Sequence, residues 1–327
     1  MRYFTLRAFF RVSRLVALRA FFPAFLFALF LPWSLVLSGA DNASLRVVCT
    51  TTILADIARQ VGGARIEVVS LMKAGVDPHT YQPTPDDVRV IASAQIVVVN
   101  GLGYEGWLDQ LIAAAGVGRE RVVVASSGVE AITASGPDHA DGHHHAGEHD
   151  PHAWHDAKNG MRYAANVRDA LVIADPAHAN DYQAWTDLYQ AQLRVMDAWV
   201  KKQIATLPIE RRVLVTSHDA LAYFARAYGL EVVAVEGIAT GQEPDPAHFS
   251  ALITLLRQRG VPAVFIETTA NPKVVERLGI EASAQLGGTL LSDSLQLPGR
   301  LGDSYLGMFA YNTRVIVSGL QRPLTKP

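Results

Sequence analysis

The sequence has almost no cysteine, since Cys49 is the only one among 327 residues. A single thiol excludes an internal disulfide framework and any zinc site built from several cysteines. Cys49 lies in an apolar run, so we expect its thiol to be buried and unreactive. A metal site in this chain would therefore have to use histidine and carboxylate side chains.

The chain also lacks an excess of positive charge. It holds 29 basic and 31 acidic side chains, for a formal net charge of −2. Five of the basic residues lie in the first 40 residues, which contain no acid: Arg2, Arg7, Arg11, Arg14 and Arg19. The remaining body is consequently acidic, which argues against nucleic acid or an anionic membrane as the main ligand.

Residues 1–40 have the pattern of a secretory signal peptide. The arginine-rich flank precedes an apolar run at 20–37, and small residues at 38–40 precede a polar aspartate. A permanent membrane anchor is the alternative, since about 18 apolar residues can just span a bilayer. Pro23 and Pro32 within the run favour cleavage, and no cysteine directly follows the run as a site for lipid attachment. We therefore expect export to the periplasm.

The rest of the chain alternates short β-branched runs with helical stretches, and it does so twice. Expected strands cover residues 46–51, 66–72, 95–99, 121–125, 213–216, 231–235, 261–266 and 289–292. Expected helices cover residues 53–60, 104–115, 220–227, 246–259 and 272–286, and another begins at Thr84. This order predicts an α/β fold with two lobes, 41–160 and 210–327, each with a parallel sheet flanked by helices.

Residues 161–209 form a helical segment that links the two lobes. Apolar and aromatic residues recur there at steps of three and four, and Pro176 and Pro208 bound the periodic part. This pattern predicts one helix of about 30 residues that bridges the lobes. The aromatic residues along it favour packing against both lobes over a cofactor site.

Two tripeptides place a carboxylate two positions before a histidine: Asp77-Pro78-His79 and Asp150-Pro151-His152. Metal-bound imidazoles usually donate their other N–H to a carboxylate or a carbonyl, so this pairing suits a metal site. Two helix starts with incidental histidines are the alternative. That reading applies to His178 and His248, each of which follows an Asp-Pro-Ala sequence that starts a helix, and we expect both to be solvated.

Two further candidate ligands directly follow expected strands, His218 after 213–216 and Asp293 after 289–292. Ligands of open α/β sheets bind at the carboxyl ends of the strands. Together with His79 and His152, these residues make a set of three imidazoles and one carboxylate, two from each lobe. Such a set suits four-coordinate Zn²⁺, and Mn²⁺ is possible through the oxygen.

These motifs resemble those of the solute-binding proteins of ABC importers for zinc and manganese, the ZnuA/TroA-like family. The resemblance covers essentially all of residues 46–320. The residues that carry it are Gly75-Val76-Asp77-Pro78-His79-Thr80-Tyr81, Pro83, Asp150-Pro151-His152-Ala153-Trp154, Ser217-His218-Asp219-Ala220, Tyr223-Phe224, Phe265-Ile266-Glu267 and Leu291-Ser292-Asp293. The family implies two α/β lobes bridged by one long helix, with a single metal ion in the cleft between them.

The resemblance implies that His79, His152, His218 and Asp293 bind the metal. Asp77 and Asp150, each two positions before a histidine, and Glu267 are the residues expected next to these ligands. It also implies a monomeric carrier that delivers its ion to a membrane permease and its ATPase. His155 stands where many members have an apolar residue, so it is a possible competitor of His152. A zinc hydrolase and a metal-binding adhesin are the other classes considered. The first would need an open coordination position and a general base near the metal, but the sequence contains no His-Glu-x-x-His and four protein ligands would leave zinc closed. The second would be favoured by a lipid anchor and repeats, and we expect neither here.

Residues 138–149 are rich in histidine and lack apolar periodicity, which predicts a mobile loop beside the cleft. The histidines are His139, His143, His144, His145 and His149. We interpret them as weak accessory metal ligands, with a tolerated polar insertion as the alternative. Zinc-specific members of the family often carry such a loop, so the resemblance favours zinc.

Overall fold

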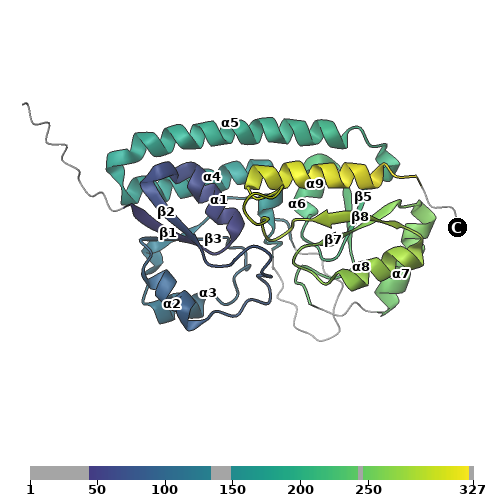
Figure 1. The fold of residues 1–327 in the computed structure, drawn as a ribbon, viewed down its shortest axis with the longest axis horizontal. Coiled ribbons are helices and arrows are strands. Elements are labelled where there is room, and N and C mark those ends of the chain that lie inside the picture. Colours follow the sequence, from purple (N-terminus) through teal and green to yellow (C-terminus); the bar gives the residue numbers. More distant parts are fainter. Residues whose placement is uncertain (1–43, 134–148, 242–245, 324–327) are drawn as a thin grey trace, which may run out of the picture. The chain divides into compact units, whose positions relative to one another are not determined.

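Four parallel strands form the sheet of the N-terminal lobe, in the order β2-β1-β3-β4. The computed structural model describes residues 44–133, 149–241 and 246–323, so the expected signal peptide and residues 138–148 lie outside it (Figure 1). The strands are β1 (Leu45–Cys49), β2 (Ile66–Ser70), β3 (Ile96–Val99) and β4 (Val122–Val124). Their parallel pairing places all four carboxyl ends at one edge of the sheet.

The helices of this lobe are α1 (Thr52–Gly62), α2 (Pro85–Ala92) and α3 (Leu108–Ala115). The expected start at Thr84 is confirmed, because Thr84 and Asp87 form a reciprocal capping box. Helix α3 starts four residues later than expected. Gly101, Leu102 and Gly103 all have positive φ angles, and this left-handed turn precedes the helix.

The C-terminal lobe contains two pairs of parallel strands, β5 with β6 and β7 with β8. The strands are β5 (Val213–Thr216), β6 (Glu231–Ala234), β7 (Ala263–Glu267) and β8 (Gln285–Leu290). The helices are α6 (Ala222–Tyr228), α7 (Pro246–Arg259), α8 (Pro272–Ala282) and α9 (Tyr305–Leu320). The expected helix 272–286 was too long, because Ser283 adopts a left-handed conformation that ends α8 and β8 begins two residues later.

Helix α5 (Ala179–Ile204) runs along both lobes, and α4 (Ala157–Ala174) packs against it beside the N-terminal lobe (Figure 1). Helix α5 packs against α1 and α4, and also against α9 of the C-terminal lobe. Its 26 residues are fewer than expected, because Pro176–His178 form a separate 3-10 turn. Tyr182 and Tyr189 are buried in the hydrophobic core, so the packing interpretation of the aromatic residues is confirmed.

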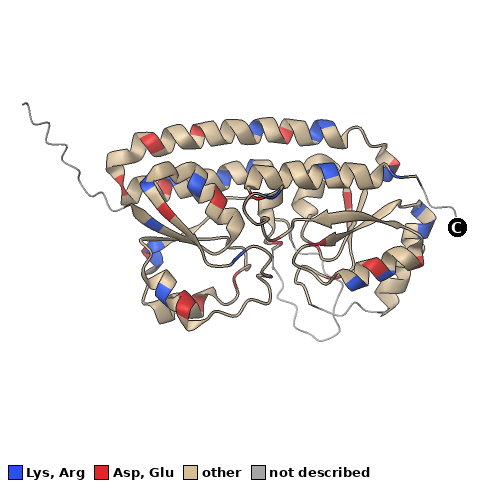
Figure 2. Ribbon diagram, viewed as in Figure 1, with Lys and Arg blue, Asp and Glu red and all other residues tan. Residues whose placement is uncertain are grey.

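Short 3-10 turns complete the described part of the chain. They are η1 (Gly63–Arg65), η2 (Arg119–Arg121), η3 (Ala153–His155), η4 (Pro176–His178) and η5 (Ile209–Arg211). Helix α4 begins before residue 160, where the first lobe was expected to end, because Asp156 caps it at Ala157. Acidic and basic residues are interspersed along the helices of both lobes (Figure 2). In the described ranges, no helix is long and apolar enough to cross a bilayer.

The two lobes are joined by hydrogen bonds as well as by α5. The carboxylate of Asp56 on α1 accepts a hydrogen bond of 2.8 Å from the backbone N–H of Tyr305, at the start of α9. Trp154 donates from its indole to the carbonyl of Ser292 at 3.0 Å, and the Tyr305 hydroxyl donates to the carbonyl of Trp154. The segment before Asp293 is therefore bonded to the opposite lobe.

Candidate metal centre

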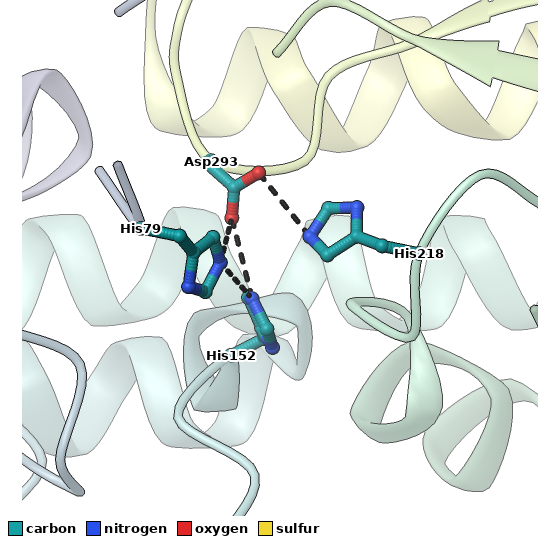
Figure 3. Close-up of side chains that lie close together, drawn as sticks. All are labelled: His79, His152, His218 and Asp293. Atoms are coloured by element: carbon teal, nitrogen blue, oxygen red, sulfur yellow. Dashed lines mark hydrogen bonds and ion pairs between the residues drawn. The ribbon is translucent and has the colours of Figure 1, made fainter. Parts of the chain in front are cut away.

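Four side chains from four different loops converge between the lobes (Figure 3). His79 lies in the loop after β2, and His152 immediately precedes η3. His218 follows β5, and Asp293 follows β8. One possible ligand atom from each residue lies within 4.8 Å of all the others, which makes this group able to hold one metal ion.

All three imidazoles of the group approach the carboxylate of Asp293. Its Oδ1 atom lies 3.3 Å from Nε2 of His152 and 3.9 Å from Nε2 of His79. Its Oδ2 atom lies 3.4 Å from Nε2 of His218, and the Nε2 atoms of His79 and His152 are 3.3 Å apart. All three imidazoles therefore direct Nε2 toward one carboxylate, as ligands around a single cation would.

In two of these rings, His152 and His218, a carboxylate contacts Nδ1, the nitrogen that faces away from the group. Oδ1 of Asp150 lies 2.8 Å from Nδ1 of His152 and accepts the backbone N–H of the same residue at 2.8 Å. Glu267, the last residue of β7, places Oε2 2.8 Å from Nδ1 of His218. With Nδ1 directed at a carboxylate, each ring keeps Nε2 for the metal.

Asp77 differs from Asp150 despite the matching tripeptides. Its Oδ1 atom accepts a hydrogen bond of 2.9 Å from the backbone N–H of His79, so it holds the loop rather than the ring. The two Asp-Pro-His sequences thus share the backbone contact, and Asp150 adds the contact to the imidazole.

Three hydrogen-bond donors to Asp293 were not expected from the sequence. The hydroxyls of Thr269 and Ser292 donate to Oδ2 at 2.7 and 2.9 Å, and the Tyr104 hydroxyl donates to Oδ1 at 3.4 Å. Ser292 precedes Asp293, and Thr269 follows β7 by two residues, so the rule that placed His218 at a strand end could have found both. Tyr104 comes from a glycine turn, and no sequence pattern pointed to it.

The charges of the group follow from burial and from these contacts. Burial disfavours the imidazolium form of His152, but Asp150 and Asp293 outweigh burial and raise its pKa to about 9. Burial also disfavours the imidazolium form of His218, but Glu267 and, after it, Asp293 outweigh burial and raise the pKa of His218 well above its ordinary value. Burial would raise the pKa of Asp293, yet the two imidazoles hold it well below its ordinary range.

His79 lacks a carboxylate behind its ring. Burial is the main cause that lowers its pKa to about 4, and Asp293 only partly opposes it. Without bound metal, burial therefore favours the neutral form of His79, whereas the neighbouring carboxylates favour the protonated forms of His152 and His218. A divalent cation would replace those protons.

The other histidines lie outside the group of four. His155 is buried, burial lowers its pKa to about 3, and its Nε2 has no hydrogen-bond partner within the described residues. The expectation that His178 and His248 are solvated was wrong. Both are partly buried, and both have a polar neighbour. Nδ1 of His178 lies 2.6 Å from Oδ2 of Asp175, and Nε2 of His248 lies 3.4 Å from the carbonyl oxygen of Ala234.

The histidine-rich segment is described only at its end. His149 is exposed and its backbone pairs with that of Thr133 in an isolated antiparallel bridge. His139, His143, His144 and His145 lie outside the described residues.

A two-lobed α/β fold with three imidazoles and one carboxylate between the lobes defines a protein that binds a metal ion. The family model described as zinc-uptake complex component A, periplasmic (ZnuA), matches residues 47–319. The chain belongs to this family of metal-binding substrate-binding proteins of ABC transporters. Its members are solute-binding proteins rather than enzymes, and they work with a membrane permease and an ATPase.

Proteins named for manganese and a protein named for zinc are both similar to this chain. The manganese-binding lipoprotein MntA of Halalkalibacterium halodurans is 32% identical over 285 residues, which cover 87% of this chain and 91% of the relative. The manganese ABC transporter substrate-binding lipoprotein PsaA of Streptococcus pneumoniae is 31% identical over 316 residues. This match covers 95% of this chain and 100% of PsaA. The solved structure of the periplasmic zinc-binding protein TroA from Treponema pallidum is 33% identical, with a TM-score of 0.78, and the match covers 85% of this chain and 100% of TroA.

Proposed function

We propose that this protein captures Zn²⁺ in the periplasm and delivers it to an ABC-type import permease. The observation that carries this proposal is the convergence of three imidazole nitrogens and one carboxylate within 4.8 Å. Imidazole suits zinc, whereas manganese prefers sites rich in carboxylate and carbonyl oxygen. Manganese is the second candidate, and it is favoured by the names of MntA and PsaA.

In this proposal His79, His152, His218 and Asp293 are the four ligands. Asp150 and Glu267 orient the rings of His152 and His218, and Asp77 holds the backbone at His79. Four protein ligands close the coordination of a tetrahedral zinc ion, which suits a transported ion better than a hydrolytic one. We expect the carrier to act as a monomer.

The proposed location is the periplasm, after removal of residues 1–40. The two curated relatives compared above are named as lipoproteins. In this chain the only cysteine, Cys49, is the last residue of β1, which lies between β2 and β3, and its side chain is fully buried. A lipid on that sulfur would disrupt the sheet, so we propose that Cys49 carries no lipid.

Elemental analysis of the protein isolated from the periplasm of its own cells tests the choice of metal. We expect one zinc ion per chain, and a predominance of manganese would favour the second candidate.

Calorimetry on metal-stripped protein tests the ligands. His79→Ala, His152→Ala and His218→Ala should each lower zinc affinity by more than about 100-fold, because loss of an outer partner alone lowers it by roughly 10–100-fold. His178→Ala and His248→Ala serve as controls and should bind normally.

The histidine-rich segment 138–149 has a separate proposed role as a collector of metal near the cleft. Ordering such a segment around an ion opposes binding by roughly 1–2 kcal/mol per residue, so its sites should be weak. Several weak sites close to a tight one would raise the local metal concentration. Deletion of 138–149 should leave the tight site nearly intact and reduce uptake chiefly when zinc is scarce. Loss of tight binding on deletion would instead show that the segment supplies a primary ligand.

A further inference from the structure

The loop that carries His79 is held to the opposite lobe at two points, and neither point is a candidate ligand. The loop joins β2 to α2 in the N-terminal lobe. Thr240, between β6 and α7, bonds to it at Asp77. Ser294, which follows Asp293, bonds to it at Gly75. The two anchors thus bracket the segment that leads to His79.

The contact from Thr240 reaches His79 through one intermediate residue. The Thr240 hydroxyl donates a hydrogen bond of 2.6 Å to Oδ2 of Asp77. The other oxygen of Asp77, Oδ1, accepts the backbone N–H of His79 at 2.9 Å. Thr80 donates from its hydroxyl to the same Oδ2 atom at 3.0 Å. One carboxylate therefore connects the ligand loop of one lobe to a buried hydroxyl of the other.

The second anchor uses the residue next to Asp293. The Ser294 hydroxyl accepts the backbone N–H of Gly75 at 2.9 Å. Thr52, at the start of α1, accepts the backbone N–H of Leu295 at 2.9 Å. The loop of Asp293 and the loop of His79 are consequently fastened to each other beside the metal centre.

Solvent access explains why this loop matters for release of the ion. The side chain of His79 is 9% exposed, whereas those of His152, His218 and Asp293 are 0% exposed. An ion that leaves the centre would therefore pass on the side of His79. Movement of the His79 loop away from the C-terminal lobe would open that side.

We infer that Thr240 is a positioning residue that slows release of the bound metal ion, by holding Asp77 and thereby the backbone of His79. This inference rests on the proposed function, since it takes His79 as a ligand. Thr240 itself does not touch the ion. Its hydroxyl sets how long the loop of His79 stays closed against the C-terminal lobe.

The experiment measures the rate at which zinc leaves the full-length exported protein. Protein loaded with one zinc ion is mixed with an excess of a fluorescent zinc chelator in a stopped-flow instrument. In Thr240→Val, which keeps the shape and removes the hydroxyl, the dissociation rate should rise about tenfold, equal to ~1.4 kcal/mol. That size is typical of a lost hydrogen bond to a charged group. The association rate should change less, because affinity differences within one site reside mainly in dissociation.

Matched variants separate this role from a general loss of structure. Thr240→Ser retains the hydroxyl and should release zinc within about twofold of the unmodified protein. Thr254→Val removes a hydroxyl that bonds only within α7, and it should leave the rate unchanged. Ser294→Ala removes the second anchor and should also speed release, which provides a test if Thr240→Val does not fold.

The outcomes distinguish the two proposals. If Thr240→Val releases zinc at the unmodified rate, the inference is wrong while the metal site stands, whatever the rate of Ser294→Ala. If Thr240→Ser is as fast as Thr240→Val, the hydroxyl is not responsible and the inference is likewise wrong. If the unmodified protein takes up no zinc, the proposed function itself fails.

Discussion

Glu267 holds His218 through both of its carboxylate oxygens. Oε2 lies 2.8 Å from Nδ1 of the imidazole, and Oε1 accepts the backbone N–H of His218 at 3.0 Å. Oε1 also accepts the backbone N–H of Ser217 at 2.9 Å. A single buried side chain at the end of β7 therefore fixes the orientation of the ring and the path of the backbone after β5.

This arrangement predicts a large effect from a small change at Glu267. Glu267→Gln keeps the size of the side chain but removes the negative charge opposite Nδ1 of His218. We expect zinc affinity to fall by roughly 10–100-fold, because outer partners of metal-bound histidines have effects of this size. Calorimetric titration of the metal-stripped protein measures it. Glu276→Gln, at an exposed position on α8, is the control, and equal affinities in the two variants would contradict the assignment.

A second prediction concerns the contact between α4 and α9. A Cβ atom added at Gly160 would overlap the ring and hydroxyl of Tyr305, whose own backbone N–H is bonded to Asp56. Tyr305 is fully buried and cannot easily move, so Gly160→Ala should destabilise the protein by about 1–3 kcal/mol despite the better helix propensity of alanine.

Thermal unfolding of the metal-free protein measures this effect as a lower Tm. Gly106→Ala is the matched control, because a Cβ atom there meets nothing within 4 Å. A Tm of Gly160→Ala at or above that of the control would show that α4 and α9 can separate without loss of stability.

The buried state of Cys49 gives a third prediction. Burial raises the pKa of its thiol to about 12, and the side chain is fully buried in β1. Since the thiolate is the reactive form, an alkylating reagent at neutral pH should modify Cys49 only after unfolding. Mass spectrometry of the native and the denatured protein after equal exposure measures this. Rapid modification of the native protein would show that β1 opens locally.

The four candidate ligands could be predicted from the sequence because each lies where a rule about the backbone applies. His218 and Asp293 follow strands, and parallel strands bring their carboxyl ends to one edge. His79 and His152 each follow an Asp-Pro sequence, and the carboxylate of that aspartate accepts a hydrogen bond from the backbone N–H of the histidine. The structure adds that all four reach one point, which spacing along the chain cannot establish.

The hydroxyl groups around the centre were harder to predict. Thr240 and Ser294 act across the gap between the lobes, and their partners are 163 and 219 residues away in the chain. They lie further beyond the ends of β6 and β8 than Thr269 and Ser292 lie from theirs, so the strand-end rule does not point to them, and threonine and serine are common in loops. Only the packing of the two lobes gives them partners.

The remaining differences in the fold have local causes. Helix α9 was not expected, because glycines at positions 307 and 319 interrupt its apolar pattern. Its close packing on β7 and β8 explains Gly319, where a Cβ atom would overlap the ring of Phe265 on β7 and lie 3.2 Å from Cα of Gly287 on β8. Tertiary contact thus outweighs helix propensity at this position.

The last prediction is that zinc affinity falls as the pH falls, over a range that extends well above the ordinary pKa of histidine. Without metal, the carboxylates beside His152 and His218 raise their pKa values, to about 9 for His152. Metal must displace both protons from Nε2, so protons and zinc compete throughout the neutral range. Each displaced proton changes the affinity about tenfold per pH unit, which gives up to about 100-fold per unit between pH 6 and 8.

Calorimetry in buffers of different ionisation enthalpy measures the number of protons released. We expect about two per zinc ion at pH 7, because His79 has a pKa of about 4 and is already neutral there. Glu267→Gln removes the charge that favours the imidazolium form of His218, so its proton release at pH 7 should fall toward one. An affinity that stays constant between pH 6 and 8 would contradict a centre in which His152 and His218 bind the ion through Nε2.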